Sequence, residues 1–327
     1  MSCSRPSLGV WRRLGVLLGS VLASLWFPLL LSGTPGDQIG VPRAVVRSSS
    51  WYLSTDGQWV NVVGEVENTS GVPLTAVQVA VTFRDAQARP VARDVGYVLA
   101  APLMPGQRAP FHLLDRVRPG VVTYTLQVTV RPGEVLPLPP LPVSAQAFPL
   151  ADGTLFFVGE VTNPLSRPVR RVRAAVTFYD EAGRVVNVAQ APALREVLPP
   201  GERSPLVAHL TEGPRHVSRW AVHVRYEEAP PEAVLRDVVV GPVQPLRNHR
   251  GHWTLRGWVR NDGPKRLTFV RLVGALYDAQ GRMVNASFSY PLTYHLDPGE
   301  TDEFAVEFWA DTGEWSSFQV WVGSAAP

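Results

Sequence analysis

The stretch Gly64-Glu65-Val66-Glu67-Asn68 returns as Gly159-Glu160-Val161-Thr162-Asn163 and again as Gly257-Trp258-Val259-Arg260-Asn261. Two further signatures follow each copy at fixed offsets from its first glycine. An aspartate comes 21 residues later, at Asp85, Asp180 and Asp278, and a second glycine comes 42 residues later, at Gly106, Gly201 and Gly299. Offsets that are kept without an insertion indicate that one folded unit occurs three times. The period of 95 and then 98 residues suits a small complete domain.

Within each repeat, apolar side chains occupy every second position of the segments between turns. Val60, Val62 and Val66 follow this alternation in the first repeat, and Val172 and Val176 follow it in the second. The alternation is typical of half-buried antiparallel strands, and no window of useful length shows a helical period. The sequence therefore predicts an all-β fold of three tandem immunoglobulin-like β-sandwich domains behind an N-terminal hydrophobic helix.

Proline-rich segments separate the repeats. Residues 132–142 contain five prolines and are expected to form an extended, semi-rigid spacer. Residues 228–232 mark the second joint. These boundaries place the domains at 44–131, 142–228 and 235–324.

The repeated aspartate opens a turn that a glycine closes in two of the three copies. Asp180 with Gly183, and Asp278 with Gly281, suit a type I turn followed by a left-handed residue. The first repeat has Ala88 at this position, so its turn is expected to be strained or differently shaped.

The first glycine of each repeat falls at a position that should face the core. Glycine is unfavourable inside a strand unless another group needs its space. We expect an aromatic ring from the last strand of each repeat to lie over the glycine, namely Tyr124, Trp220 and Phe318.

The N-terminal region directs the chain out of the cytoplasm. Residues 14–31 carry no charge, follow Arg12 and Arg13, and end at Ser32-Gly33. Their length allows two readings of residues 1–33, a signal peptide that is removed or a signal anchor that stays in the membrane. We expect an extracytoplasmic protein, either membrane-anchored through residues 14–31, which is the favoured reading, or secreted after cleavage.

Cysteine usage excludes disulfide and thiol chemistry in the repeats, and the charge balance excludes nucleic-acid binding. The single cysteine, Cys3, precedes the apolar segment, so the repeats contain no disulfide and no thiolate. The formal net charge of +3 comes from Arg5, Arg12 and Arg13, because the other 28 basic residues balance 28 acidic ones. The repeats lack the positive field that nucleic-acid binding needs, so we expect no nucleic-acid partner.

The combination of Gly-x-Val-x-Asn, a strand ending in Phe178-Tyr179-Asp180 or Leu276-Tyr277-Asp278, and Leu-x-Pro-Gly-Glu resembles the FxLYD-type domain of secreted and membrane-tethered bacterial proteins. The resemblance covers all three repeats, about four-fifths of the chain. The first repeat departs from the pattern, with Arg84 in place of the tyrosine and Gln107 in place of the glutamate. The resemblance implies an immunoglobulin-like sandwich that serves as an interaction or spacer module, and it implies no enzymatic activity.

The repeated polar residues favour structural roles. Asn68, Asn163 and Asn261, like the repeated aspartates, each open a turn, where their side chains bond to nearby backbone N–H groups. No repeat supplies the carboxylates that Ca²⁺ needs, and the two histidines of segment 248–252 are too few for zinc. We therefore expect no metal and no cofactor. Motifs for nucleophilic, zinc-dependent or nucleotide-dependent catalysis are absent from the sequence, so we expect no enzyme.

Aromatic residues concentrate in the third repeat, which holds five of the ten tryptophans. Strand parity predicts that Trp258, Trp309 and Trp321 face outward, where they would form a ligand-binding platform for a protein or a glycan. Alternatively, a domain joint, neighbouring side chains or a lipid surface covers them. We expect a non-enzymatic interaction protein with its contact surface on the third repeat. The alternatives are a structural spacer or envelope scaffold without a specific ligand, and a carbohydrate-binding accessory module.

Overall fold

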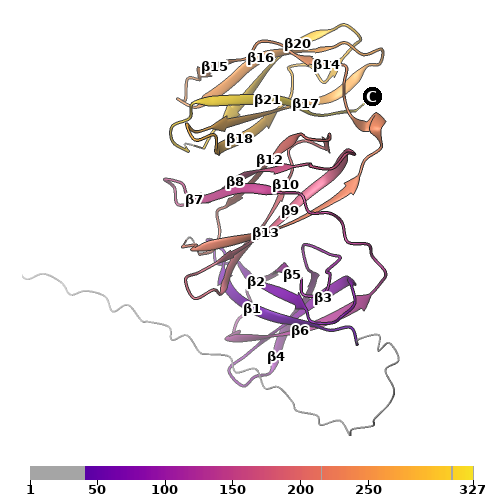
Figure 1. The fold of residues 1–327 in the computed structure, drawn as a ribbon. Coiled ribbons are helices and arrows are strands. Elements are labelled where there is room, and N and C mark those ends of the chain that lie inside the picture. Colours follow the sequence, from indigo (N-terminus) through magenta and orange to yellow (C-terminus); the bar gives the residue numbers. More distant parts are fainter. Residues whose placement is uncertain (1–40, 215, 311, 327) are drawn as a thin grey trace, which may run out of the picture. The chain divides into compact units, whose positions relative to one another are not determined.

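The computed structural model describes residues 41–326 except 215 and 311 (Figure 1). These residues form strands joined by turns, with one short 3-10 helix, so the expected all-β fold of sandwich domains is confirmed. Segment 1–33, with the expected signal peptide or anchor at 14–31, lies outside the described residues. In the part of the chain that the structure describes, no helix has the length and apolar character needed to cross a bilayer.

The strands fall into three groups that follow the repeats and belong to one compact unit. The first group is β1 (Ala44–Leu53), β2 (Trp59–Asn68), β3 (Leu74–Arg84), β4 (Pro90–Tyr97), β5 (Arg108–Arg116) and β6 (Thr123–Pro132). The second is β7 (Val143–Pro149), β8 (Leu155–Thr162), β9 (Val169–Tyr179), β10 (Val185–Pro192), β11 (Val197–Leu198), β12 (Arg203–Leu210) and β13 (Arg219–Glu228). After the 3-10 helix η1 (Pro231–Ala233), the third is β14 (Val238–Val240), β15 (Gln244–Arg247), β16 (Trp253–Asn261), β17 (Leu267–Tyr277), β18 (Met283–Ser289), β19 (His295–Leu296), β20 (Thr301–Phe308) and β21 (Ser317–Ala326).

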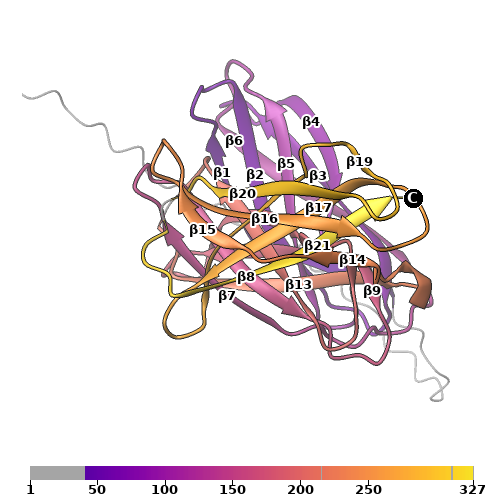
Figure 2. The same cartoon turned by 90° about the horizontal axis from the view of Figure 1, so that it is seen from above.

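Each repeat folds into two antiparallel sheets. The sheet that holds the opening strand is called the first sheet here, and it has the orders β1-β2-β5, β7-β8-β12 and, in the third repeat, β14 and β15 paired with β16, which also pairs with β20. The second sheet contains the strand that ends at the repeated aspartate, and it is built around β3, β9 or β17. Figure 2 shows β15, β16 and β20 running side by side in the third repeat.

A separate apolar core fills the space between the two sheets of each repeat. The residues that alternate in the sequence point into it, as Val62 and Val81 do in the first repeat and Val176 does in the second. Fully buried rings such as Phe178 and Phe304 add the largest areas. Truncating one such ring to alanine would cost about 3–5 kcal/mol, so each repeat is held by its own core.

The first glycine of each repeat is needed for close packing, but the expected partner is wrong. The nearest atoms to a Cβ built on Gly159 are the Ala145 Cβ and the Ser144 carbonyl oxygen, both at 2.5 Å. On Gly257, the Phe304 Cζ would lie 3.0 Å away. The glycine therefore makes room for the backbone of the opening strand and for a cross-strand neighbour, not for the ring from the last strand. Strand parity could not show this, because the crowding comes from within the same sheet.

The turn after the repeated aspartate keeps one shape in all three repeats. Gly183 and Gly281 have φ angles of 75° and 74°, and Ala88 has a φ of 60°. The amide of Ala88 still donates to the carbonyl of Asp85, as the two glycine amides donate to their aspartates. The expected strain in the first repeat is therefore present, because an L-residue is held in the left-handed region.

Candidate interaction surfaces

The repeated asparagines hold two loops together inside each repeat. The side-chain nitrogen of Asn163 donates to the carbonyls of Arg167 and Leu198, both at 2.9 Å, and its oxygen accepts from the amide of Leu165. Asn68 and Asn261 make the same set of bonds. All three side chains are fully buried and all their polar atoms are paired, so they serve the fold and offer no ligand atom to a partner.

The repeated aspartates and the second glycines also act locally. Asp180 accepts a bond from the amide of Arg184 and pairs with its guanidinium, which holds the pKa of that carboxyl below its ordinary value. Asp85 and Asp278 repeat both contacts. The amides of Gly106, Gly201 and Gly299 donate to the carbonyl of the repeated asparagine in their own repeat.

A buried polar contact joins the first repeat to the second. The Tyr179 hydroxyl, at the end of β9, donates to Oε1 of Glu65 on β2 at 2.6 Å. Arg108 on β5 reaches the other oxygen of Glu65 at 3.4 Å. Burial, with the bond to Glu65 as a second cause, raises the pKa of Tyr179 to about 12. The phenol therefore keeps the proton that it donates to Glu65.

The same contact joins the second repeat to the third. Tyr277 on β17 donates to Oε1 of Glu160 on β8 at 2.7 Å, and Arg203 on β12 lies 3.2 Å from Oε2. Burial raises the pKa of Tyr277 as well. Two joints in one chain therefore use one arrangement of tyrosine, glutamate and arginine.

Apolar side chains surround the buried pair at each joint. Val63, directly before Gly64, belongs to one buried cluster with Val185 and Val188 of β10. At the second joint, Val158 shares a cluster with Met283 and Ala286 of β18. The first sheet of one repeat thus packs its outer face on the second sheet of the next.

The loop after the second sheet's edge strand contributes to each joint. Leu99 and Leu194 pack against the apolar clusters of the first and second joint. The amide of Glu196 donates to the carbonyl of Gly323 at 2.8 Å, which is a direct backbone bond between the second and third repeats.

The corresponding loop of the third repeat is uncovered among the described residues. Leu292, the counterpart of Leu99 and Leu194, is 81% exposed, and Tyr294 is 80% exposed. Phe269 is also exposed, has a left-handed φ of 51° and meets Tyr294 edge to face with ring centroids 6.2 Å apart. We call Phe269, Leu292 and Tyr294 the apolar rim. The same φ occurs at Arg171, the equivalent residue of the second repeat, so it belongs to the fold, whereas exposed apolar side chains gathered in one place are typical of contact surfaces.

The structure does not bring the three predicted tryptophans together. Trp258 lies on the outer face of β16, half-buried, with its ring against Gly241 in the interruption between β14 and β15. Trp321 lies on β21 in the other sheet and packs into the joint with the second repeat. Trp309, 57% exposed, stacks on His209 of the second repeat at a centroid distance of 4.5 Å. Parity gave the outward direction but not the sheet: Trp321 lies on a different sheet from Trp258, and Trp309 follows the end of β20 that pairs with the start of β16, away from Trp258.

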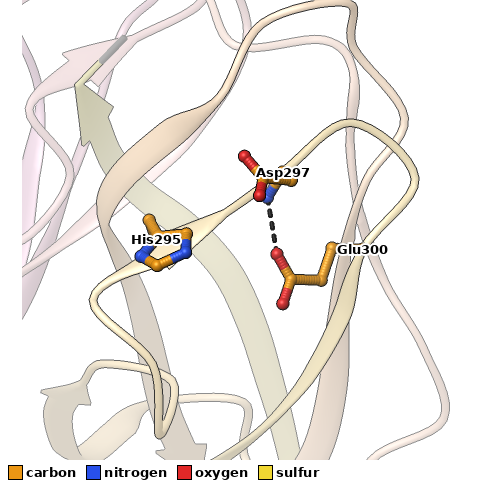
Figure 3. A group of neighbouring side chains, drawn as sticks. All are labelled: His295, Asp297 and Glu300. Atoms are coloured by element: carbon orange, nitrogen blue, oxygen red, sulfur yellow. Dashed lines mark hydrogen bonds between the residues drawn. The ribbon is translucent and has the colours of Figure 1, made fainter.

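Three side chains near the end of β19 could hold a metal ion by distance alone. The ligand atoms of His295, Asp297 and Glu300 lie within 4.8 Å of one another (Figure 3). However, Arg266 binds both oxygens of Asp297, and Glu300 accepts from the Asp297 amide at 2.7 Å. Gln107 makes the same bond to its own turn in the first repeat, so the glutamate closes the Pro-Gly turn.

The hairpin at 248–252 is likewise held by its own contacts. Asn248 accepts from the amides of Arg250 and His252, and the His252 ring bonds to Glu307 at 2.9 Å.

The joint tyrosines and glutamates were not among the predicted site residues, although the sequence carries a signal for them. Glutamate follows the first glycine in repeats one and two and is replaced by Trp258 in the third. The motif tyrosine occurs in repeats two and three and is replaced by Arg84 in the first. Each glutamate and each tyrosine of this pattern has its partner in a described neighbouring repeat.

No protein-family model and no curated protein matches the chain. Among solved structures, dimeric latent PorU from Porphyromonas gingivalis aligns at 11% sequence identity with a TM-score of 0.14. The alignment covers 81% of this chain and 30% of that chain. A similarity at this level carries no argument about fold or function.

Proposed function

We propose that this chain is a non-enzymatic extracytoplasmic protein in which three FxLYD-type domains form a fixed array that carries a contact surface on the third repeat. The observation that carries the proposal is the tyrosine–glutamate contact, made twice at equivalent positions. Polar pairs that are buried and fully bonded specify one arrangement, because any other leaves a carboxylate without a partner.

The apolar rim supports the location of the contact surface. Its leucine occupies the position that packs into the joints of the first two repeats, yet it stays exposed in the third. Large exposed apolar side chains lower solubility, so their retention favours a binding role.

The experiment compares proteins captured from the envelope fraction by the full chain and by two variants. Leu292→Asp with Tyr294→Asp removes the apolar rim, and Leu136→Asp changes a leucine that is 86% exposed in the linker as a matched control. We expect a partner with the native chain and the control and none with the rim variant. Equal recovery by all three would refute a contact surface at the rim.

The second candidate function is a structural spacer without a specific ligand. It is favoured by the joints themselves, because repeated locking sets a constant distance between the two ends of the array. Capture of no protein by the native chain would favour this function.

A further inference from the structure

The two internal joints define a docking mode that can be compared with the outer surfaces. In that mode, the first sheet of one repeat receives the second sheet of another. Two surfaces of this kind have no described partner repeat, namely the second sheet of the first repeat and the first sheet of the third. Strand register gives the residues that would meet if they docked.

Two positions that hold apolar residues inside the joints hold arginine on these outer surfaces. Arg256 directly precedes Gly257, as Val63 and Val158 precede their glycines. Arg93 pairs with Thr82 on β3, as Val188 pairs with Thr177 on β9. The valines are buried in the joints, whereas Arg93 and Arg256 are exposed.

The outer-surface residues at the positions of the joint tyrosine and glutamate are compatible with docking. Arg84 stands where the joints have tyrosine, and Trp258 stands where they have glutamate. A guanidinium over an indole ring is a favourable contact. The juxtaposition of Arg93 with Arg256 is therefore the feature that opposes stacking of one copy on the next, because like charges would be brought together in a desolvated cluster.

We propose that the outer face of the third repeat's first sheet docks a β-sandwich sheet with a carboxylate where the first repeat has Arg93, and that Arg93 keeps a second copy of this chain out. Continuity with the internal joints gives the geometry, and Arg256 gives the charge. The apolar rim extends the surface, since Leu99 and Leu194, the counterparts of its Leu292, pack at the first and second joint. This inference rests on the proposed contact surface and names the class of partner it takes.

A variant of the chain itself serves as the probe for such a partner. Arg93→Glu places a carboxylate opposite Arg256 of another copy, and Arg256→Glu places one opposite Arg93. The double variant brings two carboxylates together across the contact. Because it carries both substitutions, it controls for any effect that either substitution has by itself. Sedimentation velocity of the full chain in mild detergent, with melting temperatures recorded for all four proteins, measures the outcome.

We expect the native chain and the double variant to remain monomeric and each single variant to associate with an apparent Kd at least about tenfold lower. The products should grow with concentration, because a head-to-tail contact does not close on itself, and they should dissociate as salt rises. Single variants that fold and remain monomeric would overturn the docking geometry, whatever the envelope capture shows. Association of the native chain would overturn the exclusion of a second copy, and equal association of all four proteins would overturn the role of charge.

Discussion

Replacing Tyr277 with phenylalanine tests whether the buried contact holds the second joint closed. The change removes only the hydroxyl that donates to Glu160 at 2.7 Å and leaves the ring in its apolar cluster. A hydrogen bond to a charged group contributes about 1.5–3 kcal/mol. Since each 1.4 kcal/mol is a factor of ten, opening of the joint should become about 10- to 150-fold more frequent.

Two backbone amides report on the two joints separately. The Glu196 amide donates across the second joint to Gly323, and the Val185 amide donates across the first joint to the Ser48 hydroxyl. Hydrogen exchange followed by NMR should show faster exchange at Glu196 in the Tyr277→Phe variant and no change at Val185. Tyr179→Phe should reverse this pattern.

Tyr290→Phe is the matched control, because Tyr290 is exposed and its hydroxyl makes no hydrogen bond to the described residues. It should change neither amide. Unaltered exchange at Glu196 in a folded Tyr277→Phe variant would refute the claim that this contact closes the joint.

Three further outcomes follow from the geometry. Gly183→Ala should lower the stability of the second repeat by about 1–2 kcal/mol in urea unfolding, because φ is 75° there, whereas Ala88→Gly should not destabilise the first repeat. Asn163→Ala should cost about 2–4 kcal/mol, since it leaves two carbonyls and an amide without partners, and a melting temperature equal to the native value would contradict the role assigned to it. Because the folded pKa of Tyr179 is raised from 10.0 to about 12, its contribution is complete below pH 10 and is lost as pH rises from 10 to 12. The native chain should lose stability over that interval more steeply than Tyr179→Phe does, as measured by melting temperature against pH.

Much of the fold was predictable because it depends on local chemistry. Alternating apolar residues predicted the strands, and the missing glycine at Ala88 predicted a turn that is strained or differently shaped, of which the structure contains the strained one. The crowding around Gly159 was not predictable, because it comes from the backbone of a neighbouring strand. Trp321 was expected to face out and does so, but an adjoining repeat covers it, which no pattern within one repeat can reveal.

The unequal distribution of the joint residues has a consequence for how such a chain can lengthen. Only the second repeat carries both a donor, Tyr179, and an acceptor, Glu160. A duplicated second repeat would therefore meet compatible neighbours on both sides, whereas a duplicated first or third repeat would place an arginine or a tryptophan inside the new junction. A longer protein of this kind is therefore expected to contain additional copies of the second repeat, with the first and third repeats unaltered.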